Sequence, residues 1–209
     1  VVDPMVLADK YSTDALRYFL LREFIFGTDG NYSEDVLINR INVDLANDFG
    51  NLLSRTTAMI TKFQDGVIVA PTVKTEFDDE LLELFQTVPE EMAAYMEKLE
   101  FHNAFASVWK IIIKANKYID ECAPWALNKN GEKEKLATVL YNMAEAIRIA
   151  TILLTPVMPN TPAKVFAQLG IAEQTELHDW DALVYGGIKA GTVIHRGEPI
   201  LPVWKWKKK

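Results

Sequence analysis

Apolar residues recur at helical spacing along most of this chain, and short turns interrupt the recurrence. The clearest runs predict helices over about 78–99, 101–122 and 132–154, with turn residues between them. Residues three and four positions apart share one face of an α-helix, so each run presents one apolar face for packing. The pattern therefore predicts an all-α fold, built as an antiparallel helical bundle.

Helix-capping and helix-breaking residues place further helices before and after these three. A first unit is expected from Pro4 to Phe26, with Ser12 or Thr13 as a cap. Ser33 is expected to cap a long helix that ends at Asp65-Gly66. Prolines after residue 155 predict a switch into a short helix ending at Gly170.

The C-terminal part has a different pattern. Glycines at 186, 187 and 191 loosen the chain, and Thr192 to Val203 is expected to form two short strands around Arg196-Gly197. The full expectation is therefore a helical bundle with a small C-terminal β-hairpin extension. The last residues, from Trp204 to Lys209, are basic and aromatic.

Composition indicates an ordinary soluble globular protein, with 49% apolar and 24% charged residues. The single Cys122 permits no intrachain disulfide, which suits a cytoplasmic location. We expect no membrane partner, because the longest apolar run, Ile147 to Val157, is interrupted by Arg148. The net charge of −7 disfavours non-specific binding to nucleic acid but leaves room for a small base-reading site. The chain starts at Val1 without an initiator Met, so we expect a piece of something longer.

No catalytic, metal-binding or cofactor-binding residue is predicted. The sequence contains no GxxxxGK[ST], GxGxxG or HExxH motif and no Glu-x-x-His pair of the kind that binds two metals in a bundle. Its histidines, at 102, 178 and 195, are widely separated. The stretch from Gly186 to Thr192 has the wrong spacing for a phosphate loop, so we interpret it as a flexible linker.

The candidate functional residues are Asn51, Arg55 and Trp125. Asn51 and Arg55 are four residues apart, which places them on one helical face. The spacing predicts that this is the polar face, shared with Asp44, Asn47 and Asp48. An amide and a guanidinium can both hydrogen-bond to base edges. Trp125 follows a helix-ending Pro124, where an exposed indole could stack on an unpaired base.

Each of these residues also has a purely structural interpretation. Asn51 could satisfy a neighbouring carbonyl, Arg55 could pair with Asp48 or Asn51, and Trp125 could be buried, as Trp109 is expected to be. Taken singly, the structural interpretation is favoured for Asn51 and Arg55 and is about even for Trp125. Their coincidence at a polar end of the bundle favours base recognition.

Two segments resemble the anticodon-binding domain of methionyl-tRNA synthetases, which are class I aminoacyl-tRNA synthetases. One is NVDLANDFGNLLSR (42–55) and the other is NKYIDECAPW (116–125). The opening VVDP…YSTDALRYFL is similar to the segment after the KMSKS loop of that family, and LTPVMP (154–159) and GEP (197–199) also match. The chain then continues with LPVWKW (201–206), where the family usually has Phe-Pro-Arg.

The resemblance implies that Asn51, Arg55 and Trp125 recognise the CAU anticodon of tRNA(Met), with Trp125 stacking. It implies three units: a stem-contact segment (1–32), the anticodon-binding bundle (33–170) and a C-terminal linker with a hairpin (171–209). The HIGH, zinc-knuckle and KMSKS elements are absent from the sequence. The expected fragment is therefore non-catalytic and holds no cofactor, while ATP and possibly zinc belong to the catalytic domain of the same methionine–tRNA ligase polypeptide.

Two other functions remain open at this point. One is the anticodon-binding domain of another class I synthetase, for leucine, isoleucine, valine or cysteine. The other is a helical bundle that binds a partner helix in an exposed apolar groove. The Asn51, Arg55 and Trp125 set argues against the first. The mutual packing expected of the apolar faces argues against the second.

Overall fold

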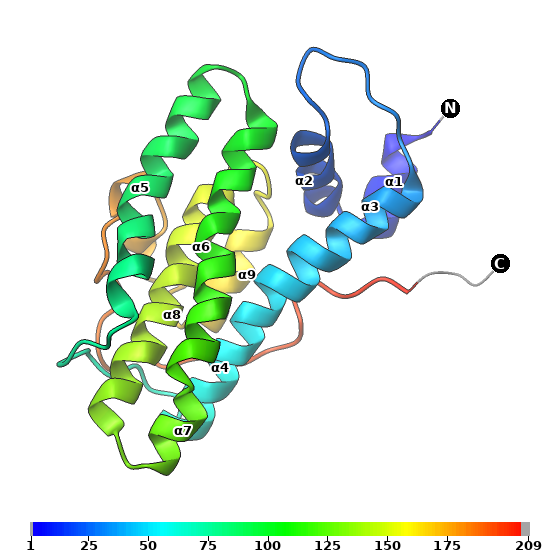
Figure 1. Cartoon of the computed structure of the whole chain (residues 1–209). Helices are drawn as coiled ribbons and strands as arrows, with labels where there is room; N and C mark the ends of the chain where they lie inside the picture. Colours follow the sequence, from blue (N-terminus) through cyan, green and yellow to red (C-terminus); the bar gives the residue numbers. More distant parts are fainter. Residues whose placement is uncertain (1, 206–209) are drawn as a thin grey trace.

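The computed structural model describes residues 2–205, and helices make up most of that part of the chain (Figure 1). They are α1 (Pro4–Tyr11), α2 (Thr13–Glu23), α3 (Glu34–Arg40), η1 (Ile41–Gly50), α4 (Asn51–Gln64), α5 (Asp78–Glu97), α6 (Phe101–Cys122), α7 (Pro124–Lys129), α8 (Lys133–Leu154) and α9 (Thr161–Gln168). Two short 3-10 turns follow, η2 (Thr175–Leu177) and η3 (Trp180–Ala182). The expected all-α helical fold is confirmed.

The centre of the bundle is α8. Every residue of this helix from Leu136 to Leu154 is buried, and α4, α5, α6 and α9 all pack against it. By length and composition alone α8 could cross a membrane, but its most apolar stretch is wholly enclosed by the other helices. Such complete enclosure is typical of a core helix in a globular bundle.

The helix ends follow from local chemistry. The Ser12 hydroxyl caps α2 by accepting the backbone N–H of Ala15 at 3.1 Å. The long helix ends where Asp65 adopts a left-handed conformation (φ 53°). Ala123 does the same (φ 46°) at the end of α6, directly before Pro124 begins α7. The predicted break at Pro124 is confirmed, because proline disfavours helical dihedral angles at the residue before it and Ala123 leaves the right-handed helical region.

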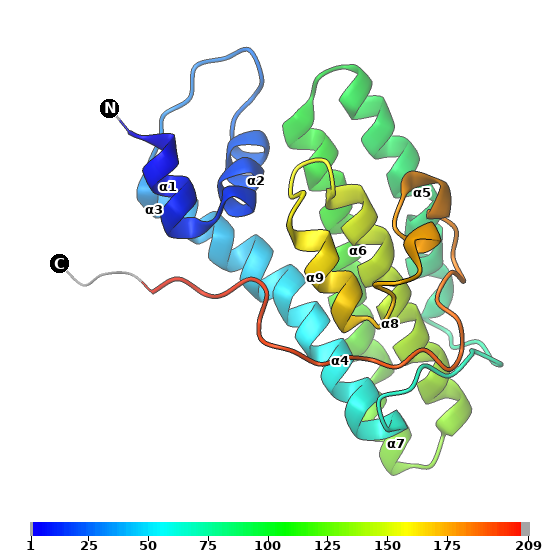
Figure 2. The same cartoon turned by 180° about the vertical axis from the view of Figure 1, so that it is seen from behind.

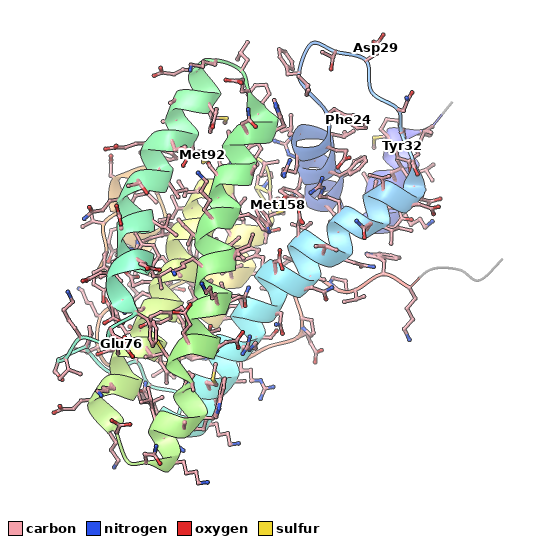
Figure 3. The ribbon with its side chains drawn as sticks, in the orientation of Figure 1. Phe24, Asp29, Tyr32, Glu76, Met92 and Met158 are labelled. Carbon is pink, nitrogen blue, oxygen red and sulfur yellow. The ribbon has the colours of Figure 1, made fainter. Side chains whose placement is uncertain are left out.

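Aromatic rings hold the two ends of the loop between α2 and α3 against α2. Phe24, at the end of α2, and Tyr32, before α3, both lie beneath the loop that carries Asp29 at its tip (Figure 3). Each ring makes an edge-on contact with Phe19, with ring centroids 5.5 Å and 6.3 Å apart. Aromatic pairs prefer this geometry. In the bundle itself, Met92 of α5 and Met158 before α9 are buried in the same core (Figure 3).

The β-hairpin expected around Arg196-Gly197 is wrong within the described residues. The segment runs as extended chain across the bundle, and its bridge is an antiparallel one between Val193 and Val67 (Figure 2). The backbone N–H of residue 194 donates to the carbonyl of residue 66, and that of residue 195 donates to residue 168. The hairpin fails because the backbone groups of this segment find partners on other elements instead of on each other.

A buried ion pair holds the segment between η2 and residue 188 on α8. Arg148 Nε lies 2.7 Å from Glu145 Oε2, and both side chains are fully buried. Arg148 also donates to three backbone carbonyls in the range 177–184. Glu145 in turn accepts the backbone N–H groups of residues 186 and 187. Both charges are therefore surrounded by hydrogen-bond partners, which is the condition for keeping them buried.

Candidate nucleic-acid interface

The helix that carries Asn51 and Arg55 changes type along its length. α3, η1 and α4 follow one another without a break, and η1 is a π-helix of 10 residues. Arg40 and Asn51, which flank η1, keep right-handed helical dihedral angles, so the rod stays continuous. π-helical stretches are rare and occur frequently at functional sites. The segment directly before Asn51 is therefore unusual in its backbone.

The π-helix rearranges the face that the sequence pattern predicts. Asp44 is expected beside Asn51 on the exposed polar face, but it is buried, and its carboxylate accepts a hydrogen bond from the Tyr18 hydroxyl at 2.7 Å. An α-helix has about 3.6 residues per turn, whereas a π-helix with i→i+5 hydrogen bonds has about 4.4. Seven residues therefore span nearly two α-helical turns but only about 1.6 π-helical turns. The prediction for Asp44 is wrong for this reason.

Asn51 is exposed and lines a groove of about 630 Å³. One wall of this groove is the helix, through Asn47, Gly50, Asn51 and Ser54, and the other wall is the extended segment 199–203. An Asn amide carries both donors and an acceptor, so it can match the hydrogen-bonding edge of a base. In the structure Asn51 thus faces an open space of ligand size and not a neighbouring helix.

Arg55 reaches across to α6. Its Nη2 lies 3.2 Å from Asp120 Oδ1, and the two side chains are 31% and 69% exposed. The alternatives of a pair with Asp48 or Asn51 are not observed, because the carboxylate that holds Arg55 comes from another helix. Asp120 lies within the second segment of family resemblance, but the sequence pattern alone did not single it out. This ion pair orients the guanidinium while leaving donors free.

Trp125 is the second residue of α7 and is 48% exposed. Ala123 and Pro124 produce this exposure, since the left-handed residue turns the chain away from the axis of α6 before α7 begins. Trp109, by contrast, is 6% exposed, as expected for a core residue. The interpretation of Trp125 as a buried core residue is therefore excluded, and one large aromatic surface is accessible to a base.

Arg55 and Trp125 lie near the C-terminal end of α6, and Asn51 lies one turn before Arg55 at the start of α4. The Arg55–Asp120 pair ties α4 to the last turn of α6, and α7 follows α6 directly. Figures 1 and 2 show α4 and α7 at the same end of the bundle. In the described residues 2–205, Asn51, Arg55 and Trp125 share no hydrogen bond, ion pair or ring contact. Their positions fit a surface that several bases could occupy.

Cys122 and His178, two titratable residues outside this surface, are packed against the rest of the fold. Burial raises the pKa of the Cys122 thiol to about 11, so the thiol stays protonated and is a poor nucleophile at neutral pH. The His178 ring stacks on Phe166 with centroids 4.1 Å apart. Within residues 2–205, no group of three or more His, Cys, Asp or Glu side chains is placed to hold a metal ion.

Comparison with known families gives two matches along the chain. Residues 1–57 match the family described as tRNA synthetases class I (M), and residues 70–200 match the anticodon binding domain of methionyl tRNA ligase. The second match covers more than half of the chain and contains Trp125, whereas Asn51 and Arg55 fall within the first.

Individual relatives agree with these family matches. The chain is 53% identical over 203 residues to a methionine–tRNA ligase of Caldanaerobacter subterraneus, covering 97% of this chain and 32% of that protein. It is 47% identical over 206 residues to that of Listeria monocytogenes, covering 97% and 31%. The free form of Mycobacterium tuberculosis methionyl-tRNA synthetase is similar in structure, with a TM-score of 0.91 at 34% identity, covering 99% of this chain and 42% of that one. The chain thus spans about a third of the length of the curated relatives it matches.

Proposed function

Because the chain belongs to the family of methionyl-tRNA ligase anticodon-binding domains, we propose that it recognises the CAU anticodon loop of tRNA(Met). Trp125 provides a surface for base stacking, and Asn51 and Arg55 provide hydrogen bonds to base edges. The observation that carries the proposal is the 48% exposure of the Trp125 indole, beside the α6 terminus that holds Arg55. About half of the ring is open to solvent, so a base can stack on it.

The whole protein, in this proposal, is a methionine–tRNA ligase that uses ATP and acts in the cytoplasm. The names of the relatives support this assignment, since they are methionine–tRNA ligases about three times as long as the match. The present chain then binds RNA and is not itself catalytic. ATP and any zinc belong to a catalytic domain of the same polypeptide, and residues 1–32 contact the tRNA stem.

The two alternative functions are less well supported. A domain from a leucine, isoleucine, valine or cysteine enzyme would not account for the match of residues 70–200 to the methionyl family. A helix-binding bundle would need an exposed apolar groove between its helices. The apolar faces of α5, α6 and α8 are instead buried against one another.

Replacing Trp125 tests the proposal most directly. We expect Trp125→Ala to weaken binding of a CAU anticodon stem-loop by roughly 1–3 kcal/mol, the value of one base stack, with little change in melting temperature. Fluorescence anisotropy with labelled RNA and a thermal melt measure the two quantities. The matched control is Trp180→Ala, because Trp180 is 47% exposed on η3 and has no assigned role.

Equal loss of RNA affinity in both tryptophan variants would contradict a specific stacking role for Trp125. A large fall in melting temperature for Trp125→Ala, with RNA affinity unchanged, would show instead that the indole stabilises the fold.

The second test concerns Arg55. If its guanidinium contacts a base edge, Arg55→Ala should weaken binding to the CAU loop more than binding to a loop with an altered first anticodon base. If the guanidinium binds only phosphate, Arg55→Ala should weaken binding of both loops equally. It should also make the slope of log K against log salt concentration shallower by about 0.7 per lost contact. Titrations of both loops at two salt concentrations distinguish the cases. Asp120→Asn is the companion variant, since it removes the observed partner and keeps the Arg.

A further inference from the structure

The extended C-terminal segment is attached to the π-helix by the side-chain amide of Asn42. The Asn42 Nδ2 donates to the Trp204 carbonyl at 2.8 Å, and the Trp204 backbone N–H donates to Asn42 Oδ1 at 2.7 Å. The Trp204 ring also makes an edge-on contact with Tyr11 of α1, with centroids 4.8 Å apart. The amide thus replaces the two hydrogen bonds that a neighbouring strand would provide.

The π-helix brings this attachment point into line with Asn51. Nine residues separate Asn42 from Asn51, which is about 2.5 turns of an α-helix but close to two turns of a π-helix. An α-helix would place the two amides on opposite sides. With η1 between them, the two amides share the side along which the C-terminal segment runs, since Asn42 holds residue 204 and Asn51 faces residues 199–203.

Gly50 lets the segment approach the helix closely. A Cβ built on Gly50 would lie 3.1 Å from the Leu45 carbonyl oxygen and 3.5 Å from Leu201 Cβ. The first distance lies within the helix itself, and the second is an ordinary van der Waals contact with the segment, so a side chain longer than that of Ala would extend toward the segment. Gly50 and the attached segment both line the groove beside Asn51.

The lining of the groove indicates what it can hold. It contains no charged side chain, but it has two Asn amides, one Ser hydroxyl and the apolar side chains of residues 199–203. Phosphate groups bind where positive charge or helix N-termini are available, and this groove lies against the middle of a continuous helix. A planar neutral base, with apolar faces and a hydrogen-bonding edge, fits such a lining.

We propose that this groove binds one unpaired nucleobase of the RNA loop, and that Asn42 is a positioning residue that holds the C-terminal segment as its second wall. The inference rests on the proposed function and adds a base site separate from the Trp125 surface. Asn51 lines the groove, and Arg55 follows it one turn further along α4. The C-terminal segment is therefore part of the recognition surface.

Filling the groove tests the proposal without disturbing the attachment. Ser54 is exposed and lines the groove, so Ser54→Leu should weaken binding of the CAU stem-loop about fivefold or more, with an unchanged melting temperature. Thr87→Leu is the control, because Thr87 is an exposed hydroxyl residue on α5 away from the groove. Equal binding by wild type and Ser54→Leu would overturn the base site.

Releasing the wall tests the role of Asn42. Asn42→Ala should weaken loop binding and speed amide hydrogen exchange in residues 199–205, while Asn103→Ala, which removes an amide at the start of α6, should do neither. Faster exchange with unchanged RNA affinity would show that the attachment is structural only. That result would overturn the positioning role.

Crosslinking locates the base directly. Stem-loops carrying 4-thiouridine at one loop position at a time should include one that crosslinks within residues 199–203, and Ser54→Leu should abolish that crosslink. The proposal would be overturned if the loop binds but every crosslink maps to protein residues outside 199–203.

The controls separate this inference from the proposed function. Suppose that the wild-type chain binds the loop and Trp125→Ala binds it more weakly, while Ser54→Leu and Asn42→Ala bind normally and no crosslink maps to residues 199–203. Only the groove inference then fails. If the wild-type chain does not bind the CAU loop in preference to an altered loop, the proposed function fails first.

Discussion

Two irregular segments near the C-terminus lie on the same bundle. A buried ion pair holds one of them, and a neutral side-chain amide holds the other. Residues 177–187 surround the buried pair of Arg148 and Glu145, where both charges are fully enclosed. Residues 199–204 are held at their end by the neutral amide of Asn42 and leave an open groove beside it. The first segment is part of the core, and the second is a surface wall.

The difference shows in how tightly each segment is packed. A Cβ on Gly187 would lie 2.8 Å from the Arg148 guanidinium carbon, which is locked in place by its hydrogen bonds. The corresponding carbon approach at Gly50, to Leu201, is 3.5 Å. A segment over a buried charge cannot move without exposing or orphaning that charge. A segment held by exchangeable neutral hydrogen bonds can adjust to a ligand at small cost.

The largest effect is expected from Arg148→Ala. The substitution leaves the Glu145 carboxylate buried without its partner, which should lower the free energy of unfolding by about 3–5 kcal/mol. Urea unfolding followed by circular dichroism measures the change.

The control is the double variant Arg148→Met with Glu145→Leu, which removes both charges. It should recover part of the loss, because an apolar pair of similar volume is often tolerated in place of a buried ion pair. A single Arg148→Ala variant as stable as wild type would contradict the view that this segment belongs to the core.

A smaller effect is expected from Asn42→Ala. Two hydrogen bonds at a half-buried site contribute together about 1–2 kcal/mol, so unfolding should be only slightly easier. The same urea titration provides the comparison with Arg148→Ala. A loss as large as that of the buried pair would remove the distinction between the two segments.

The smallest effect is expected at Asp48, in the π-helix. Burial, and then the nearby Asp44 charge, raise the pKa of the Asp48 carboxyl above its ordinary value of 3.8. The folded state therefore holds this proton more tightly, and the associated stability is present below pH 3.8 and is lost as pH rises through the higher folded pKa. Asp48→Asn should slightly stabilise the protein at neutral pH and leave it unchanged in acid. Melting temperatures measured across this pH range check the sign.

Sequence patterns predicted most of the bundle because its helices are determined locally. The run 101–122 matches α6 at both ends, since the apolar spacing and Pro124 are visible in the sequence. Asn51, Arg55 and Trp125 could be chosen by residue type and by resemblance to a family. Their partners could not, because Asp120 meets Arg55 only through helix packing across 65 positions of sequence.

The remaining errors have a common cause. The position of Asp44 depends on the π-helix, which a pattern based on α-helical spacing does not detect. The expected hairpin assumed that residues 192–203 would pair with themselves. Their backbone groups are instead paired with residues 66–68 and with residue 168.

By itself, the sequence determined the helical nature of the fold, the bounds of its long helices α5, α6 and α8 to within a few residues, and which family the chain resembles. These properties follow from interactions between residues a few positions apart and from the burial of periodic apolar side chains. The tertiary structure decided the π-helical register and the groove between Asn51 and residues 199–203. Each of these depends on which distant segments supply the packing and hydrogen-bond partners, and no local pattern encodes that choice.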